Sequence, residues 1–362
     1  MTEHTAPPTT DSAMYQTMHR QPADLAGLLE RGWEPARQAA GLVAGATRLF
    51  LVGIGTSYHA ALVGEWLFRT IGMDARAVLS FDFATYPDHY PVGPGDAVVV
   101  LAHTGTKTFS GRSLERAREA GATVVSVGSL AAEHPGSQLI LRTVERERSA
   151  AYTASHTAAM AVLAQIATEV GERRGRGEAA ELRAGLTALP DQVAGVLARE
   201  AEIDEAAHQV RARQTYVTGA GPNAATALEA VIKAREAAYA RIDALPLEQF
   251  LHGPLITVGA GDVGIVVSVP GANPTAAART AEVAGVLSRI GLWLWLVGQG
   301  APGLDGASVF ELPAVPEVVS PILAVVPLQM LAYRVATLKG VHPDTFRRDD
   351  PTYKEALLSL QL

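Results

Sequence analysis

The sequence predicts an α/β protein built from two tandem, doubly wound α/β/α sandwiches of the flavodoxin-like type, followed by a C-terminal tail. Three observations predict this fold. Short, continuously apolar segments alternate with helical patterns, the whole alternation occurs twice, and the apolar segments end in loops rich in glycine and hydroxyl residues. Buried strands of this kind are typical of parallel sheets that helices cover on both faces.

The first copy opens with an apolar strand over 48–53, which ends in the loop Gly-Ile-Gly-Thr-Ser at 53–57. A helical pattern follows from Tyr58 to Arg69. A second strand starts at Asp96, and a third strand unit spans 120–128. This order of strand, glycine loop and helix is typical of a doubly wound sheet.

The second copy repeats these units at nearly constant spacing. Gly219 lies 166 positions after Gly53, and Asp262 lies 166 positions after Asp96. The third unit recurs at 290–298, an offset of 170. A period this long indicates a duplicated domain rather than a solenoid. We therefore predict a disordered tail over 1–13, a first domain over 14–170, a helical connector over 171–205, a second domain over 206–340 and a C-terminal tail over 341–362 that carries a short amphipathic helix and lies across the surface.

Composition excludes several classes of function. The chain has 362 residues, enough for two domains at ~150 residues each. Its net charge of −7 disfavours a nucleic-acid partner, which needs a basic face. The absence of cysteine excludes disulfides, thiolate zinc sites and cysteine nucleophiles, and the ten histidines lack the spacing of metal ligands.

The ends of the chain and its apolar runs predict a cytoplasmic location. No uncharged apolar run approaches the ~20 residues of a membrane span, and the polar N-terminus lacks the features of a signal peptide. We therefore expect a cytoplasmic protein with no membrane partner, no metal and no cofactor.

Hydroxyl side chains gather where the first two strands of the first copy end. Thr56 and Ser57 follow one strand, and Thr104 and Thr106 follow the next, with Lys107 beside them. Loops at the carboxyl ends of parallel strands bind ligands, and small residues, hydroxyls and a lysine together favour a phosphate. Ordinary helix capping is the alternative explanation. The equivalent loops of the second copy have fewer hydroxyls and no lysine, so only one of the two sites is expected to bind an anion.

Gly53 and Gly55, in the loop after the first strand, resemble the start of a dinucleotide-binding fingerprint. Its third glycine is missing, because Tyr58 stands there, and no acidic residue follows the next strand. A nicotinamide site is therefore disfavoured.

One helix of the second copy carries charges in an apolar setting. Glu229, Lys233 and Glu236 are spaced i, i+4, i+7 and share one stripe of the helix, while almost all their neighbours are apolar. A helix that is apolar nearly all round is expected to be buried, so its charges must pair or function. A solvated ladder of salt bridges is the alternative. Lys233 is also one of only four lysines among 30 basic residues, and lysine alone among them loses its proton readily.

These features together resemble the sugar isomerase (SIS) family, in particular the tandem SIS domains of the isomerase half of glucosamine-6-phosphate synthases. The likeness runs from about Met14 to the C-terminus. Its most specific segments are 55–58 (GTSY), 228–236 (LEAVIKARE), 251–254 (LHGP) and 317–333. The resemblance implies a sugar-phosphate isomerase or aminosugar-phosphate deaminase that moves a proton between C1 and C2 through an open-chain enediol or imine.

The resemblance also implies roles for individual residues. Glu236 would be the base, Lys233 would stabilise the enediol oxygen, and His252 would open the sugar ring in the site of a neighbouring subunit, so a homodimer is expected. Lys354 falls near a C-terminal lysine that forms an imine with the ketose. The phosphate would be bound by residues of the first copy: Gly55, Thr56, Ser57, Thr104, Thr106, Lys107 and Ser155.

Departures from the family pattern affect the predicted substrate. The glutaminase half, which needs an N-terminal cysteine, is expected to be absent, so ammonia would be free or come from a separate partner. Ala102 and Lys107 replace a usual Ser and Thr in the second phosphate loop. The expected substrates are of the glucosamine 6-phosphate and fructose 6-phosphate type, and the alternatives are a fructosamine-phosphate deglycase and a non-catalytic sugar-phosphate-binding regulator.

Overall fold

The computed structural model describes residues 11–271, 273–300 and 304–358. Most of the predicted tail over 1–13 lies outside the described residues, and helix α1 (Ala13–Arg31) already begins at the last position of that tail. By its internal contacts the chain divides into two compact units. The first unit contains residues 20–147, 154–190 and the described part of 347–362, and the second contains the described parts of 1–19, 148–153 and 191–346. This division passes through α1 and through α7 (Glu178–Leu197); the domain boundaries expected from the sequence remain predictions.

The first unit is built on a five-stranded, fully parallel sheet with the order β2-β1-β3-β4-β5. The strands carry mainly valine, leucine and alanine, and three of them are buried along their whole length or nearly so. Their bounds are Leu49–Gly53 (β1), Ala75–Leu79 (β2), Ala97–Leu101 (β3), Thr123–Gly128 (β4) and Leu139–Arg142 (β5).

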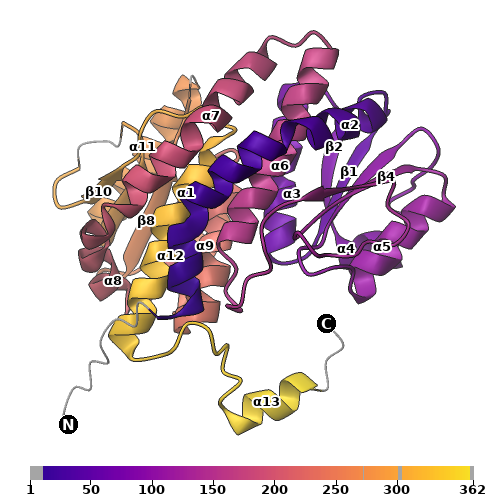
Figure 1. The fold of residues 1–362 in the computed structure, drawn as a ribbon. Helices are drawn as coiled ribbons and strands as arrows, with labels where there is room; N and C mark the ends of the chain where they lie inside the picture. The colour runs from indigo at the N-terminus through magenta and orange to yellow at the C-terminus, as the bar shows by residue number, and fades with distance from the viewer. Residues whose placement is uncertain (1–10, 272, 301–303, 359–362) are drawn as a thin grey trace. The chain divides into compact units, whose positions relative to one another are not determined.

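Helices cover both faces of this sheet (Figure 1). One group of mutually packed helices consists of α2 (Trp33–Val43), α3 (Thr56–Thr70) and α6 (Ala154–Arg173). The other group consists of α4 (Ser80–Thr85) and α5 (Thr108–Glu119). The first unit is therefore doubly wound, as the sequence predicts.

The second unit repeats this architecture with the order β10-β9-β8-β6-β7, again fully parallel. Its strands are Thr215–Gly219 (β6), Ile242–Pro246 (β7), Val263–Ser268 (β8), Trp293–Gly298 (β9) and Ser308–Glu311 (β10). Helices α8 (Asp204–Val210), α9 (Asn223–Ala238) and α12 (Ser320–Lys339) form one packed group. Helices α10 (Leu247–Leu251) and α11 (Pro274–Ile290) form the other, and short 3-10 turns span Glu200–Ile203 (η1) and Pro254–Thr257 (η2).

Strand pairing confirms the duplication residue by residue. Leu49 pairs with Ala97 in the first sheet, and the residues 166 positions later, Thr215 and Val263, pair in the second. The turns before β3 and β8 are stabilised by the same hydrogen bond. Asp96 accepts a hydrogen bond from the N–H of Gly93 at 2.9 Å, and Asp262 accepts one from the N–H of Gly259 at 2.8 Å.

Helix α12 is the most apolar helix of the second unit. Among the described residues it is the one helix long and apolar enough to cross a membrane by length and composition, with a mean hydropathy of 1.5. Of its most apolar stretch, 83% is buried inside the protein, and it packs against α8 and α9. Such burial is typical of a core helix, and Arg334 interrupts the uncharged part of the segment.

The C-terminal tail differs in part from its prediction. A short helix, α13 (Pro351–Leu358), is present, but none of its residues is buried, so it does not pack an apolar face as an amphipathic helix would.

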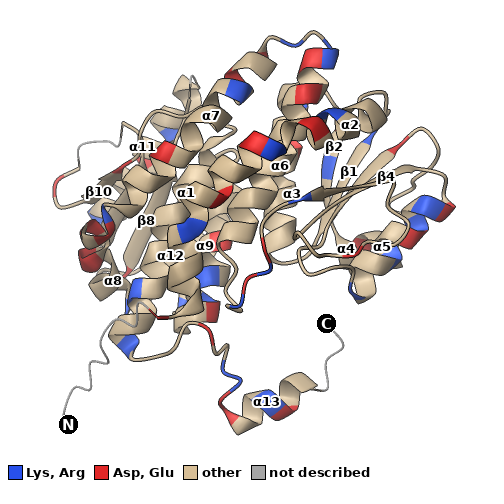
Figure 2. Cartoon of the chain, viewed as in Figure 1, with Lys and Arg blue, Asp and Glu red and all other residues tan. Residues whose placement is uncertain are grey.

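Positive and negative side chains are mixed along the surface helices. Figure 2 shows acidic and basic residues next to one another along α5 and α7 rather than in a basic stripe.

Candidate functional site

The predicted phosphate-binding residues lie at the switch point of the first sheet. The strand order reverses between β1 and β3, which are neighbours, and both strands run in the same direction. Their carboxyl ends therefore meet at one edge, which is where ligands bind in doubly wound sheets. The loops that follow β1 and β3 carry Thr56, Ser57, Thr104, Thr106 and Lys107.

The loop after β1 needs its two glycines. A Cβ on Gly53 would come within 2.6 Å of the carbonyl group of Ser57, so only glycine allows the helix to start this close to the strand. Gly55 has φ +56°, a conformation that other residues rarely adopt. The turn places Thr56 and Ser57 in the first turn of α3 with both side chains half-buried.

Two backbone N–H groups of the loop after β3 form hydrogen bonds within the chain. The N–H of Lys107 donates to the hydroxyl of Ser110 at 2.8 Å, and the N–H of Thr106 donates to the carbonyl of Glu133 at 3.3 Å. These two N–H groups are therefore used internally, and the side chains are left to meet a ligand. Thr104 and Thr106 are half-buried, and Lys107 is exposed at the start of α5.

His103 precedes these threonines and carries no charge near neutral pH. Burial, and then the positive charge of Arg146, lower the pKa of His103 to about 4. The positive charge in this loop therefore comes from Lys107 and from the N-terminal end of α5.

Ser155 lies in a different setting from the other predicted phosphate ligands. It is buried in the first turn of α6, and its N–H donates to the Glu147 carboxylate at 2.7 Å. A carboxylate of the chain thus already occupies the N–H group that an anion would use. Glu147 was missed from the sequence, because it lies eight residues before Ser155 rather than at the usual capping position.

Helix α9 confirms the predicted burial of the charged stripe. Lys233 is 1% exposed and Glu229 is fully buried, while the side chain of Glu236 is 22% exposed. The ammonium of Lys233 lies 2.5 Å from Oε2 of Glu236 and 3.6 Å from Oε1 of Glu229. The solvated ladder is therefore excluded, and the helix holds a compact acid–amine–acid cluster with one carboxylate that water reaches.

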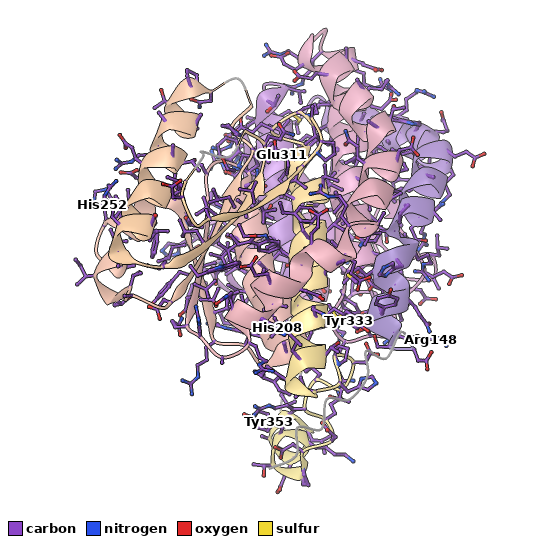
Figure 3. The ribbon with its side chains drawn as sticks, turned by 90° about the vertical axis from the view of Figure 1, so that its left-hand side faces the viewer. Arg148, His208, His252, Glu311, Tyr333 and Tyr353 are labelled. Carbon is purple, nitrogen blue, oxygen red and sulfur yellow. The ribbon has the colours of Figure 1, made fainter. Side chains whose placement is uncertain are left out.

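His252 lies on the outside of the second unit (Figure 3). Its side chain is 71% exposed, and its Nε2–H donates to Oε1 of Glu248 at 3.1 Å. Hydrogen bonds from Arg279, and then from His252, lower the pKa of Glu248 to about 2, so Glu248 stays ionised and fixes the orientation of the imidazole. Sequence reasoning missed Glu248, although its i, i+4 spacing to His252 on α10 was a usable signal.

Lys354 is exposed on α13, and its side chain belongs to no described cluster. Its assignment as an imine-forming lysine remains a prediction. Among the described residues, no group of three histidine, aspartate or glutamate side chains is arranged to hold a metal ion.

Comparison with known proteins identifies one domain of this chain. Residues 42–169 match the model of the SIS domain, so the first copy contains a SIS domain. This is the part of the chain that carries β1, β3 and the two hydroxyl-rich loops.

Several curated relatives carry the same enzyme name. The chain is 29% identical over 348 residues to "Glutamine--fructose-6-phosphate aminotransferase [isomerizing]" of Pyrococcus horikoshii, and the match covers 91% of this chain and 56% of the relative. The protein of the same name from Aeropyrum pernix is 31% identical, with 91% and 55% covered. The chain thus spans just over half the length of the curated relatives that it matches.

Solved structures share the fold. The C-terminal domain of glucosamine-fructose-6-phosphate aminotransferase from Francisella tularensis matches with a TM-score of 0.84 at 19% identity, over 92% of this chain and 98% of that one. Glucosamine-6-phosphate deaminase from Thermotoga maritima matches with a TM-score of 0.74 at 18% identity, over 92% and 97%. Together the comparisons show that the chain is homologous to the isomerase half of these aminotransferases.

Proposed function

We propose that the chain is a phosphosugar isomerase or deaminase that acts on amino-sugar or ketose phosphates of the glucosamine 6-phosphate and fructose 6-phosphate type. One observation carries the proposal: α9 buries Lys233 between Glu229 and Glu236 and leaves only the Glu236 carboxylate partly open to water. Burying three charges is costly, and such clusters are typical of functional sites. The names of the curated relatives and of the Thermotoga maritima deaminase support the substrate class.

In this proposal Glu236 is the base that moves the proton between C1 and C2 of the open-chain sugar. A largely buried carboxylate that remains partly accessible suits this step, because a general base must lie within hydrogen-bond reach of the proton that it removes. Lys233 holds that carboxylate in place at 2.5 Å. For Lys233 also to stabilise the enediol oxygen, its ammonium must share its hydrogens between Glu236 and the substrate, which three N–H donors permit.

The loops after β1 and β3 would hold the phosphate. Thr56, Ser57, Thr104 and Thr106 offer hydroxyl donors, and Lys107 offers a positive charge. The N-termini of α3 and α5 add favourable dipoles. Ser155 would contribute through its hydroxyl, since its N–H is already bonded to Glu147.

Two further roles complete the proposal. His252, oriented by Glu248, would open the sugar ring in the site of a second subunit, and Lys354 would form an imine with the ketose. In the deaminase direction, water replaces the amino group and free ammonia leaves, so the chain needs no glutamine. We place this chemistry in the cytoplasm, as expected from the sequence.

The proposal is tested by incubating the purified protein with glucosamine 6-phosphate and measuring fructose 6-phosphate and ammonia. Glu236→Gln is expected to lower the rate at least 100-fold, the order that loss of a general base costs, and to leave the Kd for fructose 6-phosphate within about twofold. Glu205→Gln, which changes an exposed carboxylate of the same unit, is the matched control and keeps full activity.

A panel of hexose, hexosamine and fructosamine phosphates separates the alternatives. Turnover of fructosamine phosphates alone would favour a deglycase. Binding without turnover on the whole panel would favour a regulator and contradict the proposal.

A further inference from the structure

The two copies share the backbone of their glycine loops. In the first loop of each copy, Gly53 and Gly219 approach the start of the next helix so closely that a Cβ would lie 2.6 and 2.5 Å from a carbonyl oxygen. Gly55 and Gly221 then have nearly the same φ, +56° and +55°. The second copy therefore kept the loop geometry that the phosphate site of the first copy is proposed to use.

The space above these glycines differs between the copies. A Cβ built on Gly55 meets no described heavy atom within 4 Å. A Cβ on Gly221 would lie 3.1 Å from Oε1 of Glu317, and one on Gly271 would lie 3.0 Å from Oε2 of the same carboxylate. One glutamate side chain thus lies against both glycine loops of the second copy.

The start of α12 fixes the backbone of Glu317. The N–H and the hydroxyl of Ser320 donate to the carbonyl of Glu317 at 3.1 and 2.6 Å. The side-chain amide of Asn223, the first residue of α9, donates to the same hydroxyl at 2.8 Å. Through Ser320 and Asn223, these bonds connect the backbone of Glu317 to the helix that follows the first glycine loop.

Within the described part of the chain, no positive charge pairs with this carboxylate. None of the described residues forms an ion pair or a side-chain hydrogen bond with the Glu317 carboxylate, and burial raises its pKa. The hydrogen bonds between Ser320 and the backbone carbonyl of Glu317 therefore place the residue beside the loops without a cation from the described residues.

The first copy has no such side chain at the matching position. The helices α6 and α12 begin at Ala154 and Ser320, again 166 positions apart. The same offset places Ala151 opposite Glu317. The first copy therefore has a methyl group where the second copy has a carboxylate.

We propose that the side chain of Glu317 prevents phosphate from binding to the two glycine loops of the second copy, so that the chain binds one sugar phosphate and not two. A carboxylate has the charge and nearly the size of a phosphate face, and it excludes a second anion by volume and by repulsion. The phosphate site of the proposed function lies in the first copy, so this inference can fail or hold separately from that site.

The test is a titration of inorganic phosphate followed by amide NMR spectra of the whole chain. In the wild type, the signals of Gly221 and Gly271 are expected to stay unchanged up to 20 mM phosphate, a concentration ~10 times above a weak anion site of ~2 mM. Glu317→Ala, which installs the first copy's residue, is expected to give saturable shifts at both glycines. Glu205→Ala removes one exposed carboxylate of the same unit and is expected to behave as the wild type.

Either of two results overturns the proposal: phosphate-dependent shifts of Gly221 and Gly271 in the wild type, or none in the folded Glu317→Ala variant. Glu317→Ser serves as the second small variant if the alanine variant does not fold. The signals of Gly55 and Gly105 report on the other copy in the same spectra. Their failure to shift would contradict the phosphate site of the proposed function and leave the result for Glu317 standing.

Discussion

Lys233 is one cation held by two carboxylates inside an apolar helix. Its side chain is 1% exposed, and Glu229 beside it is fully buried. Removing the cation leaves a buried carboxylate without its charge partner, which typically costs 3–5 kcal/mol, whereas removing a partner from an exposed pair costs ~0–1 kcal/mol. The cluster is therefore a stability determinant as well as a proposed catalytic group.

We predict that Lys233→Met lowers the free energy of unfolding by about 3 kcal/mol, measured by urea denaturation at pH 7. The double variant Lys233→Met, Glu229→Gln should regain part of that loss, since it neutralises the buried partner. Arg76→Met, which breaks the exposed pair with Asp74, is the matched control and should cost less than 1 kcal/mol. Equal losses in the Lys233 and Arg76 variants would show that the α9 cluster is solvated in solution.

His103 makes stability depend on pH. Its pKa is about 4 in the folded chain and about 6.5 when unfolded. Above pH 6.5 His103 is neutral in both the folded and the unfolded chain, so its titration does not lower the stability. As the pH falls from 6.5 towards 4, only the unfolded chain takes up the proton, so stability falls by up to about 3 kcal/mol.

We therefore predict that His103→Gln reduces the loss of stability between pH 7 and pH 5 by about 2 kcal/mol relative to the wild type. Urea denaturation at the two pH values measures it, and His208→Gln, at an exposed position, is the control that should leave the loss unchanged. An NMR titration that gives His103 a pKa near 6.5 would contradict the argument.

The residues that sequence reasoning found and missed differ in one physical respect. Lys233 and Glu236 were predictable, because both lie on one helix and their spacing alone places them together. Glu147 and Glu317 were not, because each acts on a loop or helix end through tertiary packing, which leaves no periodic signal. Lys354 was named from the family resemblance, and its exposed side chain adds no structural support for the role.

At the scale of elements, the strand-to-helix loops depend on glycine. Gly53→Ala and Gly219→Ala each force a Cβ to within about 2.6 Å of backbone atoms, so each is expected to lower the free energy of unfolding by about 2 kcal/mol or more. Gly45→Ala, where a Cβ meets nothing within 4 Å, is the control and should change stability by less than about 0.5 kcal/mol. Thermal unfolding curves of the three variants measure this, and a neutral Gly53→Ala would show that the loop can open at little cost.

The strands and the large helices were predictable for a related reason. Their apolar runs and the offset of 166 residues are local and repeated, and both sheets are parallel, as the predicted fold class requires. The tail was harder to predict. Apolar residues in 351–358 indicated an amphipathic helix, but whether such a face finds a surface depends on packing, and α13 buries none of its residues.

At the scale of the whole molecule, the role proposed for His252 requires a second subunit. The side chain of His252 is 71% exposed, and Glu248, which Arg279 contacts, fixes its orientation. If His252 opens the sugar ring, another part of the assembly must bring the substrate site to it. In a two-fold symmetric dimer each His252 would serve the site that holds the partner's Glu236. The proposal thus requires a dimer, which light scattering on the wild type tests directly.

Subunit mixing then tests the shared site. Glu236→Gln and His252→Ala proteins are each expected to be poorly active, and unfolding and refolding them together should yield heterodimers in which one of the two sites is intact. Random pairing makes half of the dimers mixed, so the mixture should recover roughly a quarter of the wild-type activity, above the sum of its parents. Each variant refolded alone is the control. Recovery no greater than that sum would mean that His252 and Glu236 serve one chain, and a monomeric wild type would remove any role for His252 in a neighbouring site.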